Sequence, residues 1–440
     1  MKTKIAFLAT VGGMLLAAAC GPKAIEESNG ESQPETGLTV GHLAKQAAEP
    51  QVELVFTASA RVSIEQFMEQ HGGKEIQKKF PNTKITFLPG GDLQTLVTTK
   101  QHFDILLSSV GLTPSSLLTY DLQSDISDLI AKTKYDLSRL EPSTIEIQRQ
   151  LANGGIYGLP VNTVSSALFY NKDLFDRFGV GYPTDRMTWN ELFELTKRMT
   201  RSEGGVRYSG LTIAFQHLMF LNQLSAPHLD PVTNKARFTD ADFTRAFENM
   251  ARFYRIPGNG LTKNTFSLPE QKSLFNKEQT AAMHLTLSSL GVDNIGMNWD
   301  MVRTPVFPDK PDTGPQSYPS YFYLTSMSKQ RDAAFQVLAY ITSDEFQEWQ
   351  AKNGVPTILN DQTRVMTDFG INQPLYKGKN IKAILPEKFA GPTLKPRYQS
   401  MADKEVLNAL GEYSAGKDVN SALREAAERA DRTIAAEAGK

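Results

Sequence analysis

The feature that most constrains the fold of this chain is an alternation of short apolar runs with helical patterns, which begins at Val52. Three runs have the length and the β-branched or aromatic content of strands: 52–56, 84–88 and 103–107. Between them lie helical patterns over 64–80, interrupted at Gly72 and Gly73, and over 93–99. The order strand, helix, strand, helix, strand predicts an open α/β sheet with right-handed crossovers.

Such a sheet also predicts where a ligand would bind. In open α/β sheets the ligand crevice lies beyond the carboxyl ends of the strands. Ser59 and Arg61 follow the first predicted strand, and Ser108 and Ser109 follow the third. We expect these four side chains to contact a ligand, while an ordinary role as polar loop residues stays open.

Length and charge exclude several classes of protein. The 440 residues exceed the size at which a single hydrophobic core stops growing, so we expect at least two. The balance of 47 Lys plus Arg against 48 Asp plus Glu argues against nucleic-acid binding, which needs a clustered basic excess. No apolar run approaches the ~20 residues of a membrane span.

The sequence contains none of the common enzymatic motifs that we sought. Its six histidines show no HExxH spacing, and neither a G-x-S-x-G elbow nor a G-x-x-x-x-G-K-[ST] phosphate loop is present. One cysteine can form neither an intrachain disulfide nor a thiolate metal cluster. We therefore predict no catalytic residue, no metal site and no cofactor, although a carboxylate pair could still assemble in space.

The amino terminus has the pattern of an export signal. Lys2 and Lys4 precede an uncharged run over 5–19, which is too short for a permanent membrane span and ends in small residues. Cys20 follows directly. We therefore predict a signal peptide over 1–19.

The residues before Cys20 resemble the lipobox of bacterial lipoproteins, in which the thiol is diacylated and becomes the first residue. Ala17 stands where that motif prefers leucine. The resemblance implies a lipid anchor at Cys20, and the alternative is an ordinary secretory signal with an accidental cysteine. Residues 20–50 are poor in large apolar side chains, so we predict a flexible tether there.

The middle of the chain carries the most specific patterns. Residues 155–160, Gly-Ile-Tyr-Gly-Leu-Pro, lead into 167–175, Ala-Leu-Phe-Tyr-Asn-Lys-Asp-Leu-Phe. The second run predicts a strand followed by a short helix that closes at Gly179. Thr188 and Glu191 then form a capping box, which predicts a helix that begins at Trp189.

These runs resemble family 1 of the bacterial extracellular solute-binding proteins, which serve ABC importers. Two later segments agree with the family pattern: 326–347 and 416–426. The resemblance implies a two-lobed, periplasmic-binding-protein-like α/β fold of type II with the ligand in the cleft between the lobes. By position we expect lobe 1 over 51–161 plus 319–353, lobe 2 over 162–318 plus 354–440, and a hinge at Pro160 and Val161.

The resemblance and the chain order extend the candidate site to both lobes. The additional solute-contacting residues that we predict are Thr163, Val164, Gln216, His217, Thr286, Ser288, Tyr318, Tyr321 and Arg397. The usual glycine of the family is absent near Thr286, and a structural role for His217 stays open. We interpret Trp189 and Trp349 as core residues, whereas Trp299 falls in a segment over 296–303 that we read as irregular and could not place.

Taken together, these features predict a monomeric, lipid-anchored receptor on the outer face of the cell membrane. It would capture a small solute, by resemblance a carbohydrate such as an oligosaccharide, and deliver it unaltered to the transmembrane subunits of an ABC permease. Two alternatives stay open, namely a secreted lipoprotein that hydrolyses or cleaves glycans and a receptor that only senses its solute.

Overall fold

The computed structural model describes residues 52–259, 266–294 and 296–439. The predicted signal peptide, the anchor at Cys20 and the tether over 20–50 lie outside the described residues. Within the described ranges, no helix is long and apolar enough to cross a bilayer. No group of three or more His, Cys, Asp or Glu side chains in these ranges is arranged to hold a metal ion.

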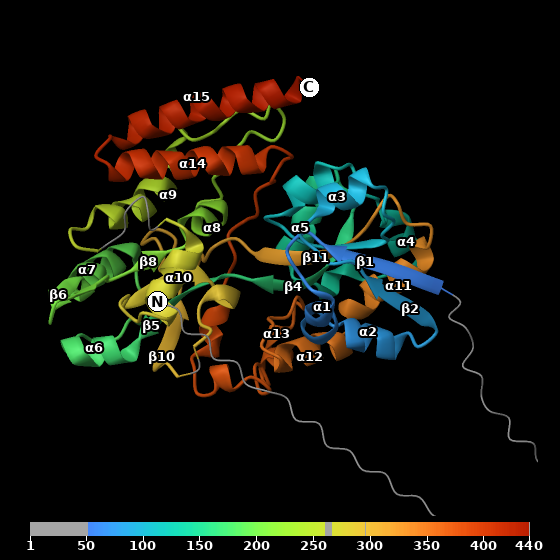
Figure 1. Ribbon diagram of the computed structural model, residues 1–440, viewed down its shortest axis with the longest axis horizontal. Coiled ribbons are helices and arrows are strands. Elements are labelled where there is room, and N and C mark those ends of the chain that lie inside the picture. The colour runs from blue at the N-terminus through green and yellow to red at the C-terminus, as the bar shows by residue number, and fades with distance from the viewer. Residues whose placement is uncertain (1–51, 260–265, 295, 440) are drawn as a thin grey trace, which may run out of the picture. The chain divides into compact units, whose positions relative to one another are not determined.

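Two β-sheets organise the described chain (Figure 1). The first has the order β2-β1-β3-β11-β4, with the bounds Thr83–Phe87, Val52–Ala58, Ile105–Ser109, Tyr318–Leu324 and Gly158–Val164. Strands β1, β2 and β3 are parallel, as predicted. Strand β11 comes from much later in the chain and runs antiparallel to both β3 and β4.

Helices pack on both faces of this first sheet, which is the core of lobe 1. One face shares a core with α1 (Ile64–Gln70), α2 (Gly73–Lys79), α11 (Arg331–Ile341) and α12 (Asp344–Lys352). The other face packs against α3 (Leu93–Thr98), η1 (Pro114–Leu118) and α5 (Pro142–Leu151).

The helix predicted over 64–80 is in fact two helices, α1 and α2. Gly72 separates them with a backbone φ of +84°, in the left-handed region that glycine adopts without strain. A Cβ atom at this position would overlap the ring of Phe346, so the break also admits α12 against the sheet.

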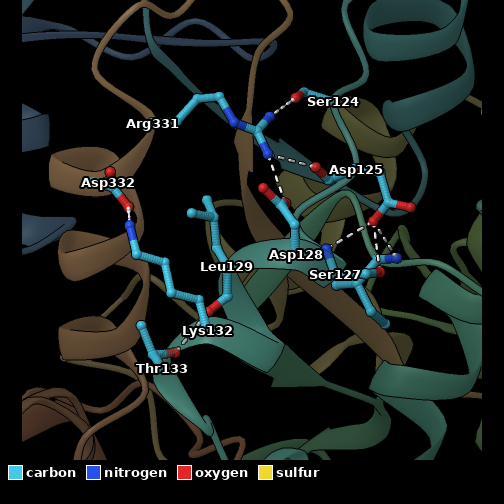
Figure 2. A network of polar contacts seen from close by, with 10 residues as sticks. Ser124, Asp125, Ser127, Asp128, Leu129, Lys132, Thr133, Arg331 and Asp332 are labelled. Atoms are coloured by element: carbon cyan, nitrogen blue, oxygen red, sulfur yellow. Dashed lines mark hydrogen bonds and ion pairs between the residues drawn. The ribbon is translucent and has the colours of Figure 1, made fainter.

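A polar network joins α4 (Ser127–Thr133) to the beginning of α11 on lobe 1 (Figure 2). Arg331 donates to Ser124 Oγ at 2.5 Å and to Asp128 Oδ1 at 2.7 Å. Lys132 pairs with Asp332 at 2.7 Å. These side chains are largely exposed, so each ion pair contributes about 1 kcal/mol or less to stability.

The second sheet is the core of lobe 2. Its order is β10-β5-β9-β8, with the bounds Trp299–Arg303, Ser166–Asn171, Met283–Leu287 and Thr212–Ile213. The helices of this lobe are α6 (Lys172–Phe178), α7 (Trp189–Met199), α8 (Phe215–Phe220), α9 (Ala241–Ala251), α10 (Leu268–Asn276), α14 (Gln399–Ser414) and α15 (Val419–Ala438). A two-stranded hairpin, β6 (Arg201–Glu203) with β7 (Val206–Tyr208), follows α7.

Several local predictions in lobe 2 are confirmed. Helix α6 ends at Gly179 in the left-handed conformation, with φ of +62°. Thr188 and Glu191 form both hydrogen bonds of the capping box at the start of α7. Trp189 lies in the lobe 2 core, 4% exposed.

The interpretation of 296–303 as irregular is wrong. Residues 299–303 form β10, which pairs antiparallel with β5. Trp299 is 1% exposed and packs against Phe169 with the ring centroids 5.7 Å apart. Because alternate residues of the strand, Trp299 and Met301, point to the buried side, the indole is a core group and not a cleft group.

The chain passes between the sheets at three places. Strand β4 continues into β5 through Ser165, residues 304–317 return to β11, and 353–398 lead from α12 to α14. Pro160 and Val161, which we predicted as the hinge, lie inside β4, where Pro160 pairs with Tyr321. The chain leaves the first sheet only after Val164, so the structure places the change of sheet at Ser165.

The predicted start of lobe 2 at residue 354 also needs adjustment. Ile358 O accepts a hydrogen bond from Glu141 N at 2.8 Å, and Asn360 N donates to Arg139 O at 2.8 Å, both on lobe 1. Ile358 and Phe369 belong to the hydrophobic cluster that also holds Phe335 of α11 and Phe346 of α12. The chain joins lobe 2 later, where η7 (Ile381–Ile384) packs on β10 and β5.

Candidate functional site

The two sheets turn the ends of their strands toward a common point. On lobe 1, Val164 pairs with Tyr318 and Ser109 pairs with Ser320, so the ends of β3 and β4 and the start of β11 share one edge. On lobe 2, β5 begins opposite the end of β9, where Ser166 pairs with Leu287. Since Ser165 joins the two edges, the polar residues at both lie near each other.

Three serines form the lobe 1 wall of the candidate site. Ser116 Oγ lies 3.1 Å from Ser59 Oγ and 3.2 Å from Ser108 Oγ. Ser59 and Ser108 meet because β1 and β3 are parallel neighbours that end together. Ser116 lies in η1, a single turn of π-helix, and we did not predict it as a site residue. Its position a few residues after a buried strand is the sequence feature that could have indicated it.

Tyr318 stands where the two walls meet. Its hydroxyl lies 3.3 Å from Ser109 Oγ of lobe 1. Its ring lies 5.8 Å from the ring of His217 and 6.0 Å from that of Phe220, both on helix α8 of lobe 2. Burial raises the pKa of the Tyr318 phenol, so the group stays protonated and can both donate and accept hydrogen bonds.

Four hydroxyls gather where the two sheets join: Ser165, Thr286 and Ser288 form the lobe 2 wall, and Thr163 lies beside them at the end of β4 on lobe 1. Each hydroxyl oxygen is buried and has no hydrogen-bond partner among the described residues. Strand pairing gathers them, since Ser288 N donates to Ser165 O at 2.8 Å and Thr286 pairs with Ala167. A buried polar group without a partner costs about 1–3 kcal/mol, so a cluster of four indicates missing partners.

Helix α8 brings a histidine to this wall. It begins directly after β8, and its first turn carries Gln216, which is exposed, and His217, which is half-buried. Burial lowers the pKa of His217, although the nearby Asp403 carboxylate opposes this shift. The imidazole is therefore neutral at pH 7 and offers one donor and one acceptor.

Two buried ionisable residues that we did not predict, Lys395 and Asp403, lie near helix α8. Lys395 Nζ donates to Phe220 O at 2.9 Å and lies 4.4 Å from the Phe220 ring centroid. Burial lowers the pKa of Lys395 to about 7, opposed by Asp403. Asp403 in turn lies 2.7 Å from His228 Nδ1. No local pattern marks Lys395 or Asp403, because their partners are far away in the sequence.

The remaining predicted residues are placed differently. Tyr321 is 0% exposed and donates to Thr144 O at 2.7 Å, so it belongs to the lobe 1 interior and not to the site. Val164 is 6% exposed among apolar neighbours. Arg61 is exposed at the edge of lobe 1. The guanidinium of Arg397 contacts lobe 1 protein atoms, namely Leu118 O and the Asp121 carboxylate.

A groove of about 1140 Å³ lies elsewhere, between the beginning of α5 and residues 386–392, and it shares no residue with the predicted site. Two of its acidic groups already have partners within the protein. Glu141 accepts from Thr144 N at 3.2 Å, and Glu387 pairs with Arg186 and Arg303, each at 2.7 Å. The unpartnered hydroxyls therefore mark the interlobe edge, rather than this groove, as the stronger candidate site.

Solved structures with the same fold come from several bacteria. A substrate-binding protein from Listeria monocytogenes, solved with cycloalternan, has a TM-score of 0.68 at 18% identity over 87% of this chain and 99% of its own. The sugar-binding protein MalE from Xanthomonas citri has a TM-score of 0.66 at 17% identity over 88% and 98%. A solute-binding protein from Agrobacterium vitis, with bound D-mannitol, has a TM-score of 0.60 at 17% identity over 88% and 99%.

These likenesses establish the two-lobed fold of type II. The sequence itself establishes the family, because residues 60–348 match the bacterial extracellular solute-binding proteins, as predicted from the runs around Gly158 and Trp189. This match covers more than half of the chain. The chain therefore belongs to the bacterial extracellular solute-binding proteins.

Proposed function

We propose that this protein captures a small carbohydrate between its two lobes and releases it chemically unaltered to an ABC permease. The observation that carries the proposal is the cluster of four buried, unpartnered hydroxyls where the two sheets join, three of them on the lobe 2 wall, next to a serine wall on lobe 1. Proteins of the same fold were solved with cycloalternan, D-mannitol and maltotetraose, which are all neutral and rich in hydroxyls.

The chemistry of the wall suits such a solute. A serine or threonine hydroxyl can donate one hydrogen bond and accept two, and a sugar hydroxyl has the same capacity. Thr286 and Ser288 could therefore bond to a sugar without placing an uncompensated charge against it. Tyr318 and the neutral His217 add an aromatic face and further polar atoms at the same edge.

Closure of the lobes would couple to binding through these contacts. A ligand shifts an equilibrium between open and closed forms only by its difference in affinity for the two. A solute that bonds to the serines of lobe 1 and to the hydroxyls of lobe 2 has such a difference, because both walls reach it only when the lobes are close. No step of bond making or breaking is part of the proposal.

A panel of solutes tests the proposal. Thermal unfolding of the purified protein would be followed with maltotetraose, maltose, D-mannitol, D-tagatose, amino acids and polyamines. We expect a carbohydrate to raise the midpoint and to be recovered intact by mass spectrometry. A shift with an amino acid or polyamine alone would contradict the carbohydrate assignment, and recovery of a cleaved glycan would favour a hydrolase or lyase.

Attachment and transport form the second part of the proposal. We propose that Cys20 is acylated and holds the protein on the outer face of the membrane. A Cys20→Ser variant should appear in the medium, whereas the wild type should stay with the membrane fraction. Retention of the variant at the membrane would contradict lipid anchoring, and unchanged uptake after deletion of the permease would favour a sensing role.

A further inference from the structure

Arg397 connects the two lobes. It lies directly before α14, whose Ala402 and Val406 pack in the lobe 2 core, and its neighbour Tyr398 packs against the same core. Its guanidinium donates to Leu118 O and to the Asp121 carboxylate, which both belong to lobe 1. Arg397 thus lies at the lobe 2 end of the third crossing segment, while its charge contacts lobe 1.

The receiving end on lobe 1 is built for a cation. Leu118 is the last residue of η1, so its carbonyl oxygen is one of those that a helix end leaves without an intrahelical partner. A positive charge at the carboxyl end of a helix is favourable. Asp121 lies just beyond with a φ of +50°, and its own carbonyl oxygen accepts from Ser326 Oγ at 3.2 Å.

The same helix carries a residue of the candidate site. Ser116 in η1 lies within hydrogen-bonding distance of Ser59 and Ser108, which end the two central strands. Arg397 therefore binds the last residue of η1, and Ser116 in the middle of η1 is part of the lobe 1 wall. In this structure the guanidinium of Arg397 is bound by protein atoms, namely Leu118 O and the Asp121 carboxylate.

We propose that Arg397 is a positioning residue, an interlobe latch that stabilises the closed arrangement by binding the end of η1, and not a direct contact to the solute. The site that the latch would close is the one proposed above, but the latch itself needs no solute. Its partners lie on lobe 1, so a movement of η1 away from the start of α14 would break its contacts, and contacts that are lost on opening bias the equilibrium toward closure.

The test measures closure without any ligand. Spin labels on cysteines at Gln94 in α3 and Arg424 in α15, both exposed, report the distance between the lobes in a Cys20→Ser background. We expect Arg397→Ala and Asp121→Asn each to lower the ratio of short to long distances about 3- to 10-fold, as for a charge pair with partly exposed side chains. Asparagine tolerates a positive φ, so Asp121→Asn removes the charge and keeps the backbone.

Matched variants separate a latch from a general weakening of the fold. The double variant should shift the ratio no further than Arg397→Ala alone, because Asp121 acts only through Arg397. Arg397→Lys should give an intermediate ratio, because lysine keeps the charge but not the planar guanidinium. Raising the salt concentration should lower the wild-type ratio but not that of Arg397→Ala. Arg432→Ala, an exposed arginine on α15, should leave the distances unchanged.

Two results would overturn the latch. One is a distance distribution that Arg397→Ala leaves unchanged, and the other is a set of single-variant effects that simply add in the double variant. Neither result depends on a solute, so the latch can fail while solute binding stands. Equally, a failure of every carbohydrate to bind would leave the distance measurement intact.

Discussion

The two walls of the interlobe edge are both lined by small hydroxyls, yet they differ in one physical respect. On lobe 1, Ser116 lies within hydrogen-bonding distance of both Ser59 and Ser108. On lobe 2, Thr286 and Ser288 are buried with no partner among the described residues. Lobe 1 thus presents a preformed hydrogen-bond network. The hydroxyls of lobe 2 are buried at a cost in free energy, and a polar group of a ligand would offset that cost by bonding to them.

This difference has a consequence for stability and binding. Residues that are satisfied within the fold contribute to its stability, while unsatisfied groups at a site lower it and reserve their hydrogen bonds for the ligand. Substitutions on the lobe 1 wall should therefore lower the unfolding free energy more than the affinity for the solute. Substitutions on the lobe 2 wall should lower the affinity and leave the unfolding free energy equal or higher.

The largest effect concerns Lys395, the buried lysine that contacts Phe220 at the end of helix α8. Since burial lowers its pKa from the unfolded value to about 7, the unfolded state binds more protons between pH 7 and pH 10, and this group makes the fold more stable as the pH rises. Lys395→Met should therefore exceed the wild type in unfolding free energy by a few kcal/mol at pH 6, and the gap should shrink toward pH 10.

Urea unfolding at several pH values measures this gap, with the exposed Lys404→Met as the control. Asp403 also acts on Lys395, so the comparison keeps that carboxylate in both proteins. A gap that is constant with pH would contradict a buried lysine that is forced toward neutrality.

The next effect concerns the unpartnered hydroxyls themselves. The double variant Thr286→Val, Ser288→Ala should bind the carbohydrate identified by thermal shift about 10- to 100-fold more weakly, because it deletes two hydrogen-bonding groups of the wall. Its unfolding free energy should equal or exceed that of the wild type. Calorimetric titration and urea unfolding give both numbers.

A partnered threonine provides the control for this variant. Thr196 is also buried in lobe 2, but its hydroxyl donates to Leu192 O at 2.8 Å. Thr196→Val should lose about 1 kcal/mol of stability and keep the affinity. If Thr286 and Ser288 behaved like Thr196, the contrast between the two walls would not hold.

The smallest effect concerns the centre of the lobe 1 wall. Ser116→Ala removes the hydroxyl that Ser59 and Ser108 share, so it should cost about 1 kcal/mol of stability and weaken solute binding only a few-fold. The exposed neighbour Ser115→Ala serves as the control and should change neither quantity measurably. A loss of affinity as large as that of the lobe 2 double variant would show that lobe 1 is not the preformed wall.

Local patterns in the sequence predicted much of the fold for a physical reason. Strands such as β1 and β3, the capping box at Thr188 and the helix end at Gly179 depend on residues only a few positions apart. The pairing of β11 between β3 and β4 joins segments more than 150 residues apart, so no local pattern could predict it. Trp299 was missed because a short, partly polar strand looks irregular without its partner β5.

The residues of the candidate site also fall into those that a local pattern predicted and those that depend on distant contacts. Ser59 and Ser108 followed from the rule that ligands bind beyond strand ends, and the structure brings them together through Ser116. Tyr321 followed only from its closeness to Tyr318 in the sequence. In the structure Tyr318 reaches Ser109, whereas Tyr321 is fully buried and donates to Thr144 O. The burial of Lys395 and Asp403 depends on packing against segments that are distant in the sequence, so no local sequence pattern indicated these residues.

The most direct test of the central claim is a crystal structure of the protein with the carbohydrate that gives the largest thermal shift. We predict solute oxygens within about 3.2 Å of Thr286 Oγ1 and Ser288 Oγ, with the serines of lobe 1 on the opposite side of the ring. A solute that lies instead in the groove beside α5, with the lobe 2 hydroxyls still unpartnered, would contradict it.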